Sequence, residues 1–181
     1  MGASPSADAL PRARRNSPCR RSGEYWRGSV WSPTNYMLLR GLTKTGFHDL
    51  AHEIARNHHA AVVRVFEATG TLWENHAPDT LEPGSTSAAN FVGWTGLTPT
   101  AILFEYLFGL RPNVPERRLI WDVRLLEAHG VERYPFGAEG LLELRCAART
   151  QAREKPIITI KSNLGLRLEI IWDAGREVLT I

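Results

Sequence analysis

Residues 47–68 carry the clearest pattern of apolar and polar positions in the chain. Apolar residues and one histidine recur there in steps of mostly three and four. Since an α-helix completes a turn in about 3.6 residues, this spacing gathers them on one side of a helix. The pattern therefore predicts a long amphipathic helix over about residues 47–68. The positions are Phe47, Leu50, Ala51, Ile54, His58, Ala61, Val62 and Val65.

Two shorter helices are predicted on either side of it. Ser-Pro at 32–33 and Thr-Pro at 98–99 each place a hydroxyl group in front of a proline. A hydroxyl side chain caps the first N–H groups of a helix, and proline is well tolerated at the first helical position. We therefore expect helices over about residues 32–40 and 98–108. Helix-ending residues follow them: Gly41 after the first, and Gly109 and Pro112 after the second.

Beyond residue 112 the period of the pattern changes to two. Apolar residues alternate with polar or smaller ones, as in strands with one buried face, and the run DAGRE at 173–177 is a turn signal. The pattern predicts a small antiparallel β appendage over residues 113–181. Its apolar positions are Leu119, Trp121, Val123, Leu125, Leu142, Leu144, Cys146, Ile158, Ile160, Leu166, Leu168 and Ile170.

Residues 1–22 differ from the rest in composition. They are rich in Arg, Ser, Pro and Ala, and contain one leucine and no aromatic or β-branched residue. Such a segment buries too little apolar surface to offset its ordering entropy, so a disordered basic tail is expected. The tail has five arginines and one aspartate, a charge of +4, against +3 for the whole chain. Residues 23–181 therefore lack the excess positive charge that favours nucleic-acid binding.

Neither a membrane, a metal nor a cofactor is indicated by any pattern. No apolar run approaches the ~20 residues that span a bilayer, and no signal-peptide core is visible. The two cysteines, Cys19 and Cys146, favour free thiols in a reducing, cytoplasmic setting. HEIAR at 52–56 has arginine where a zinc-binding HExxH helix needs its second histidine.

The chemistry concentrates in residues 69–96. Glu74 lies between a tryptophan and an asparagine, and a loop rich in Gly, Ser and Thr leads from it to Phe91 and Trp94. Indole rings offer a flat apolar face and one N–H donor, which suits stacking on a sugar ring. Packing in a core is the alternative role of these aromatic residues, and composition alone leaves both open.

Three stretches carry a resemblance to a known family. They are YWRGSVWSPTNYMLLRGL (25–42), TGTLWENHAPD (69–79) and NFVGWTGLTPTAILFEYLFGL (90–110). In this order they resemble the C-terminal part of inverting (α/α)6-barrel glycosidases. The likeness is greatest to glycoside hydrolase family 63, which includes mannosylglycerate hydrolases and processing α-glucosidases, with trehalase as a relative.

The resemblance implies a mainly α fold and a division of the chain. Residues 23–112 would be the C-terminal piece of an (α/α)6 toroid, in which the three predicted helices are the last of a double ring. Residues 113–181 would follow as the β appendage, after the tail of residues 1–22. The loops between the helices would line the sugar-binding mouth.

The resemblance also assigns site residues. Glu74 matches the general base, which takes a proton from the water that attacks the anomeric carbon. Trp26 and Arg27 match positions that line the site, although a structural salt bridge is an alternative for Arg27. The other candidate sugar-binding residues are Trp31, Asn35, Asn75 and Trp94. Either asparagine would equally satisfy a local backbone group.

Several positions depart from the family pattern. Ser29 and Ser32 stand where prolines are usual, and Asn90 stands where aspartate is frequent. In WENHAPD, His76 replaces a tyrosine and Asp79 replaces a glutamate. Since histidine titrates near neutral pH, His76 is expected to change what the subsite recognises.

An inverting glycosidase needs two carboxyl groups about 6.5–9.5 Å apart. In the family the acid is an aspartate far upstream, in a segment this chain lacks, and Asp79 and Glu82 lie on the same loop as Glu74. We therefore expect a carbohydrate substrate, an α-glucoside, α-mannoside or small oligosaccharide. The missing N-terminal part of the barrel would be needed for activity. A non-catalytic carbohydrate-binding remnant and a truncated gene product are the alternatives.

Overall fold

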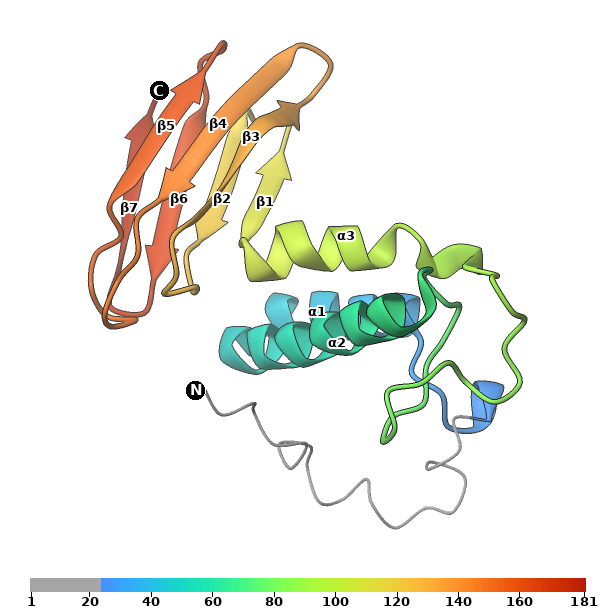
Figure 1. Ribbon diagram of the computed structural model, residues 1–181. Helices are drawn as coiled ribbons and strands as arrows, with labels where there is room; N and C mark the ends of the chain where they lie inside the picture. Colours follow the sequence, from blue (N-terminus) through green and yellow to red (C-terminus); the bar gives the residue numbers. More distant parts are fainter. Residues whose placement is uncertain (1–23) are drawn as a thin grey trace. The chain divides into compact units, whose positions relative to one another are not determined.

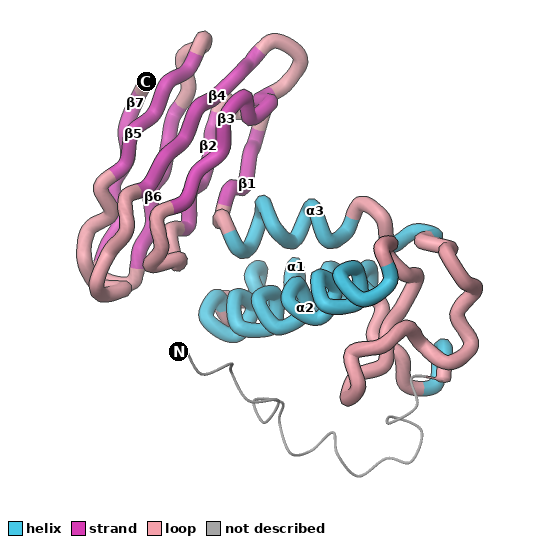
Figure 2. The backbone as a smooth tube through the Cα atoms, in the orientation of Figure 1, coloured by secondary structure: helices cyan, strands magenta, loops and turns pink. Residues whose placement is uncertain are grey.

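The computed structural model describes residues 24–181, so the predicted tail lies outside the described residues. Three helices are followed by seven strands in two sheets (Figures 1 and 2). Helices and strands occupy comparable shares, and the described residues form no ring of helices. The fold is therefore mixed rather than mainly α. No helix among residues 24–181 is long and apolar enough to cross a membrane.

The described chain forms two compact units. Residues 24–41 and 57–99 belong to one unit, and residues 42–56 and 100–181 belong to the other. The long helix contributes to both, because the division falls between its residues 56 and 57. The candidate site residues all lie in the first unit, and the strands all lie in the second.

Helix α1, Ser32–Lys44, begins at the predicted hydroxyl residue but runs past its predicted end. Gly41 lies inside the helix and is not among the glycines with positive φ. Gly46 has a φ of 89° and donates from its N–H to the carbonyl of Thr43. Since a left-handed residue stops a helix and glycine adopts that conformation at little cost, Gly46 is the terminator.

Helix α2, His48–Thr69, confirms the long amphipathic helix within one residue at each end. Its buried face differs at the N-terminal end, because Phe47 and Leu50 are exposed. Gly70, with a φ of 74°, follows the helix and donates to the carbonyl of Phe66. The residues that α2 buries are Ala51, Ala55, His58, Ala61, Val62 and Val65.

The third helix is built from two kinds of turn. Its α part, α3, is Thr98–Ile102, and a π-helical part, η6, follows at Leu103–Leu107. Gly109 ends it with a φ of 73°, as predicted. A Cβ atom on Gly109 would lie 2.0 Å from the carbonyl oxygen of Asp122, so no other residue fits.

The seven strands form a four-stranded and a three-stranded sheet, ordered β1-β2-β6-β7 and β3-β4-β5. Four of the five strand pairs are antiparallel, but β2 and β6 are parallel, which corrects the all-antiparallel prediction. Strands β1 and β3 are absent from the prediction. The strands are β1 Leu110–Asn113, β2 Arg118–Asp122, β3 His129–Phe136, β4 Gly140–Cys146, β5 Ile158–Ser162, β6 Arg167–Trp172 and β7 Gly175–Thr180.

The two sheets share one hydrophobic core. Alternate residues of β2, β4 and β6 point into it, as the period of two predicts, and side chains of β1 and β3 complete it. Phe104 and Phe108 of the preceding helix pack against the same cluster. Its fully buried members from the predicted positions are Leu119, Trp121, Val123, Leu142, Leu144, Cys146, Leu166, Leu168 and Ile170.

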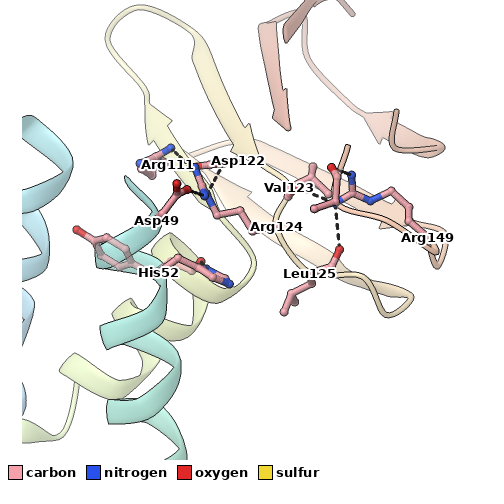
Figure 3. A network of polar contacts seen from close by, with 10 residues as sticks. Asp49, His52, Arg111, Asp122, Val123, Arg124, Leu125 and Arg149 are labelled. Atoms are coloured by element: carbon pink, nitrogen blue, oxygen red, sulfur yellow. Dashed lines mark hydrogen bonds and ion pairs between the residues drawn. The ribbon is translucent and has the colours of Figure 1, made fainter. Parts of the chain in front are cut away.

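Two clusters of polar contacts surround the end of β2 in the second unit (Figure 3). Asp122 accepts hydrogen bonds from Arg111 Nη2 at 2.9 Å and from Arg124 Nε at 3.0 Å. Arg124 also pairs with Asp49 in the first turn of α2. The buried Arg149 donates to four main-chain carbonyls, at residues 123, 125, 152 and 154. Arg124 therefore joins the end of β2 to the first turn of α2, and Arg149 joins the loop after β2 to residues 152–154.

Candidate active site

Glu74 is held at the backbone on both sides. Its N–H donates to the carbonyl of Phe91 at 3.1 Å, and its carbonyl accepts from Thr95 Oγ1 at 2.6 Å. Thr95 belongs to the short 3-10 turn η5, Gly93–Thr95. The loop rich in Gly, Ser and Thr therefore returns to Glu74, which is only 8% exposed.

The Glu74 carboxylate binds a tyrosine from the start of the described chain. Tyr25, in the 3-10 turn η4, Tyr25–Arg27, donates from its hydroxyl to Oε1 of Glu74 at 3.0 Å. This hydrogen bond, together with burial and the negative charge of Glu74, raises the pKa of Tyr25. The hydroxyl is therefore protonated, and is a donor, across the neutral pH range.

A cavity of about 300 Å³ lies beside this pair. The described residues that line it are Tyr25, Glu74, Thr86, Ala88 and Phe91. Glu74 is the one carboxylate among them. Half of Phe91 is exposed, so an aromatic side chain and a carboxylate face the same space, as in small-molecule sites with an apolar wall and a few polar groups.

Three of the predicted sugar-binding residues form an aromatic cluster. Trp26 stacks on Trp31 with ring centroids 4.0 Å apart and planes 6° from parallel. Trp94 lies edge-on to both, at 6.2 and 6.3 Å. Trp31 is 3% exposed, whereas Trp26 and Trp94 are 59% and 53% exposed. The open indole surface therefore belongs to Trp26 and Trp94, and Trp31 supports them from below.

Arg27 forms an ion pair with Glu24 at 3.1 Å, and both side chains are largely exposed. This is the structural salt bridge that the sequence left open as an alternative. Surface pairs of this kind contribute little to stability, about 0–1 kcal/mol. Arg27 is not among the residues that line the cavity, and its contact with sugar stays a prediction.

Asn35 is half-buried and contacts a buried histidine instead of lining the cavity. Its Nδ2 donates to Nδ1 of His58 at 3.0 Å, and Nε2 of His58 lies 3.0 Å from Ser32 Oγ. Since an amide N–H can only donate, Nδ1 of His58 is the acceptor and Nε2 carries the proton. Burial lowers the pKa of His58 to about 3, so its ring is neutral at neutral pH.

The residues next to Glu74 are buried with it. Asn75 is 2% exposed, and neither atom of its side-chain amide has a hydrogen-bond partner among residues 24–181. The backbone of His76 pairs with Val30. Burial lowers the pKa of His76 to about 4, which corrects the expectation that its charge changes near neutral pH.

Asp79, Glu82 and Asn90 lie away from the Glu74 pair. All three are exposed and none lines the cavity, so no carboxylate on this loop joins Glu74 there. Asn90 has a φ of 56°, a left-handed conformation that asparagine tolerates better than most residues. Within residues 24–181, no three His, Cys, Asp or Glu side chains are grouped so that they would hold a metal ion.

Glu74 is the one predicted site residue among the five described residues that line the cavity. Phe91 was noted only as an aromatic residue of the same stretch, and Tyr25, Thr86 and Ala88 were not predicted. Tyr25 and Phe91 lie inside the motifs quoted above, next to Trp26 and near Trp94. Tyr25 and Glu74 are 49 positions apart, so no periodicity joins them. The one available signal was membership of the quoted motifs. The motifs at 25–42 and 90–110 each place one aromatic residue, Tyr25 and Phe91, beside the Glu74 carboxylate.

A comparison with protein families identifies the family of the chain. The Glycosyl hydrolase family 63 C-terminal domain matches residues 12–103, just over half of the chain. The cavity residues and the tryptophan cluster all lie within the matched segment. The protein is thus of the glycoside hydrolase class, and the chain belongs to glycosyl hydrolase family 63. No solved structure matches it significantly.

The chain is also similar to three curated plant proteins. Alpha-glucosidase 2 of Arabidopsis thaliana is 30% identical over 95 residues, which cover 45% of this chain and 11% of that protein. Mannosyl-oligosaccharide glucosidase GCS1 of the same plant is 31% identical over 95 residues, covering 45% and 10%. Mannosylglycerate hydrolase MGH2 of Selaginella moellendorffii is 28% identical over 99 residues, covering 55% and 19%. The chain therefore spans between a tenth and a fifth of these relatives.

Proposed function

We propose that this chain carries the base-bearing part of an inverting glycosidase site. Glu74 would take a proton from a water molecule, and the water oxygen would attack the anomeric carbon of an α-glucoside, α-mannoside or small oligosaccharide. The supporting observation is a buried carboxylate with one oxygen held by Tyr25, in a cavity of about 300 Å³. That volume is at the lower end of the range of small-molecule sites.

The surrounding aromatic residues support a sugar ligand. Phe91 forms one wall of the cavity, and exposed faces of Trp26 and Trp94 lie in the same unit. Aromatic faces bind the C–H surface of a sugar ring while its hydroxyls seek polar partners. In this proposal Trp31 supports the aromatic wall, and Arg27, Asn35 and Asn75 are secondary candidates for hydroxyl contacts.

The second carboxyl group would come from outside the described residues. An inverting site needs an acid about 6.5–9.5 Å from the base, and Glu74 is the one carboxylate among the described cavity residues. We propose that the acid belongs to the preceding part of an (α/α)6 toroid, of which residues 23–112 are the C-terminal piece. Since a general acid contributes typically 10²–10⁴-fold in rate, this chain alone would be inactive or nearly so.

The test compares Glu74→Gln with Glu82→Gln in a form that contains the rest of the catalytic domain. We expect Glu74→Gln to reduce hydrolysis of α-glucosides or α-mannosides by at least about 10²-fold. Glu82→Gln, the same change at an exposed carboxylate, should leave hydrolysis unchanged. Proton NMR should show a product of inverted configuration. A retained product, or full turnover by Glu74→Gln, would remove Glu74 from the role of base.

A second candidate is carbohydrate binding without turnover. It is favoured by the two exposed indole rings of Trp26 and Trp94, whose centroids lie 6.2 Å apart. Calorimetry on this chain by itself separates the two functions. A binding module would release heat with an oligosaccharide and lose that signal in Trp26→Ala and Trp94→Ala. The base-bearing part of a divided site would bind no oligosaccharide until the rest of the domain is present.

A further inference from the structure

The backbone of Tyr25 adopts a conformation that costs free energy. Its φ is 50°, in the left-handed region that an aromatic residue seldom occupies. Three donors hold it there: the N–H groups of Gly28 and Ser29 and the indole Nε1 of Trp31 all point to the carbonyl of Tyr25. A strained residue fixed by several surrounding bonds is a frequent feature of functional sites.

The ring of Tyr25 packs against two tryptophan rings. It meets Trp31 edge-on at 4.9 Å and Trp26 edge-on at 5.7 Å, both at 75°. Edge-to-face contacts are a favourable arrangement of aromatic rings, so both tryptophans stabilise this orientation of the tyrosine ring. With the backbone and ring held, the hydroxyl is placed in advance at Oε1 of Glu74.

The Glu74 carboxylate has two oxygens, and Tyr25 engages one of them. Among residues 24–181, Tyr25 is the one side chain that hydrogen-bonds to this carboxylate. Oε2 is therefore the oxygen without such a partner from the described chain. Because a single bond to Oε1 limits rotation of the carboxylate, it also determines where Oε2 lies.

We propose that Tyr25 is a positioning residue for Glu74: its hydroxyl holds Oε1, so that Oε2 is the oxygen that faces the reacting water. This inference rests on the proposed function. In the step, a water O–H bond breaks and its proton passes to Oε2, while the water oxygen forms the bond to the anomeric carbon. The glycosidic bond breaks, and its oxygen takes a proton from the second carboxyl group. Trp26 and Trp31 then act on the site through Tyr25.

The first experiment measures the mobility of the Glu74 side chain in this chain. NMR relaxation of ¹³C- and ²H-labelled glutamate gives its order parameter in the wild type, in Tyr25→Phe and in Tyr134→Phe. Tyr134→Phe is the matched control, because it removes a tyrosine hydroxyl from the β core in the other unit. We expect the order parameter of Glu74 to fall in Tyr25→Phe alone. An unchanged value in Tyr25→Phe would overturn the proposal.

The second experiment observes the same contact through the tyrosine signal. It does not use Tyr25→Phe, so it can be carried out even if that variant does not fold. The ¹³Cζ signal of Tyr25 is titrated in the wild type, Glu74→Gln and Glu82→Gln. We expect the midpoint to fall toward the ordinary value of 10.0 in Glu74→Gln and to stay in place in Glu82→Gln. If the midpoint of Tyr25 is the same in Glu74→Gln as in the wild type, the contact is absent. Both readouts are independent of hydrolysis, so failure of the glycosidase function leaves them interpretable.

Discussion

At the scale of single residues, the side-chain amides of a half-buried and a buried asparagine have opposite environments in the same unit. Asn35 donates to Nδ1 of His58, and its bond sets the tautomer of that ring. Asn75, next to the proposed base, is almost fully buried, and neither of its side-chain amide atoms has a partner in the part of the chain that the structure describes. An unpaired buried polar group costs free energy, whereas a paired one is close to neutral.

This contrast predicts opposite effects of one substitution. Asn75→Leu removes two unsatisfied atoms at similar volume, so we expect the free energy of unfolding to stay equal or rise by about 1 kcal/mol. Asn35→Leu leaves Nδ1 of His58 without a donor and should lower it by about 1–3 kcal/mol. Urea denaturation measures both. Equal destabilisation by the two variants would mean that Asn75 has a hydrogen-bond partner beyond the described residues.

At this scale one residue of the cavity could be predicted from the sequence. Glu74 belongs to the WENH motif that carries the family resemblance, and the structure places it in a cavity with two aromatic residues. The hydrogen bond from Tyr25 was not readable, because it joins residues 49 positions apart. The burial of Trp31 and the pairing of Asn35 with His58 were hidden for the same reason.

At the scale of elements, the two glycines near the end of α1 have different functions. Gly41 lies within the helix, while Gly46 has the left-handed φ that ends the turn. The sequence predicts the helix end at Gly41, because either glycine is a plausible helix C-cap. A Cβ atom at either position would meet no atom within 4 Å, so an alanine there would clash with no neighbouring side chain or strand and only the local backbone conformation matters.

The same substitution at these two glycines should therefore change the stability in opposite directions. Gly41→Ala replaces the poorest common helix former by the best, so we expect stabilisation of about 0.5–1 kcal/mol. Gly46→Ala forces alanine into a left-handed conformation and should destabilise by about 1–2 kcal/mol. Thermal melts followed by circular dichroism compare them. Stabilisation by Gly46→Ala would show that α1 ends elsewhere.

Strand direction is an element property that the sequence did not reveal. The period of two identified the inward residues of β2 and β6, yet the two strands pair in parallel. The chain passes through the whole three-stranded sheet between them, and alternation is identical for either direction. Strand β3 was missed because its register shifts between Val131 and Tyr134, which interrupts its alternation.

At the scale of the whole molecule, two buried histidines link global stability to pH. Burial lowers the pKa of His58 to about 3 and that of His76 to about 4, with their ring centroids 5.6 Å apart. In the unfolded chain both groups protonate near pH 6.5. Between these values the unfolded state binds more protons, so stability falls as the pH falls below about 6.5 and levels off below the folded pKa values.

The expected loss is roughly 2 kcal/mol per histidine between pH 7 and pH 5. His76→Gln removes one titrating group and should reduce the slope of unfolding free energy against pH over this interval. Asn57→Gln, a change at an exposed residue of α2 that does not titrate, is the control and should keep the wild-type slope. Urea unfolding at half-unit pH steps measures the slopes. Identical slopes in the wild type and His76→Gln would contradict a neutral, buried His76.

The sequence by itself determined what depends on neighbours along the chain: the extent of α2, the left-handed Gly109 and the inward positions of the strands. Local periodicity and turn chemistry carry that information, because helices and strands repeat over a few residues. Glu74 as the candidate base came instead from the resemblance of its motif to a known family. Only the tertiary structure decided that Tyr25 meets Glu74, that Trp31 is covered by Trp26, and that β2 and β6 are parallel. These contacts join distant positions, and burial and pairing are fixed by the path of the folded chain.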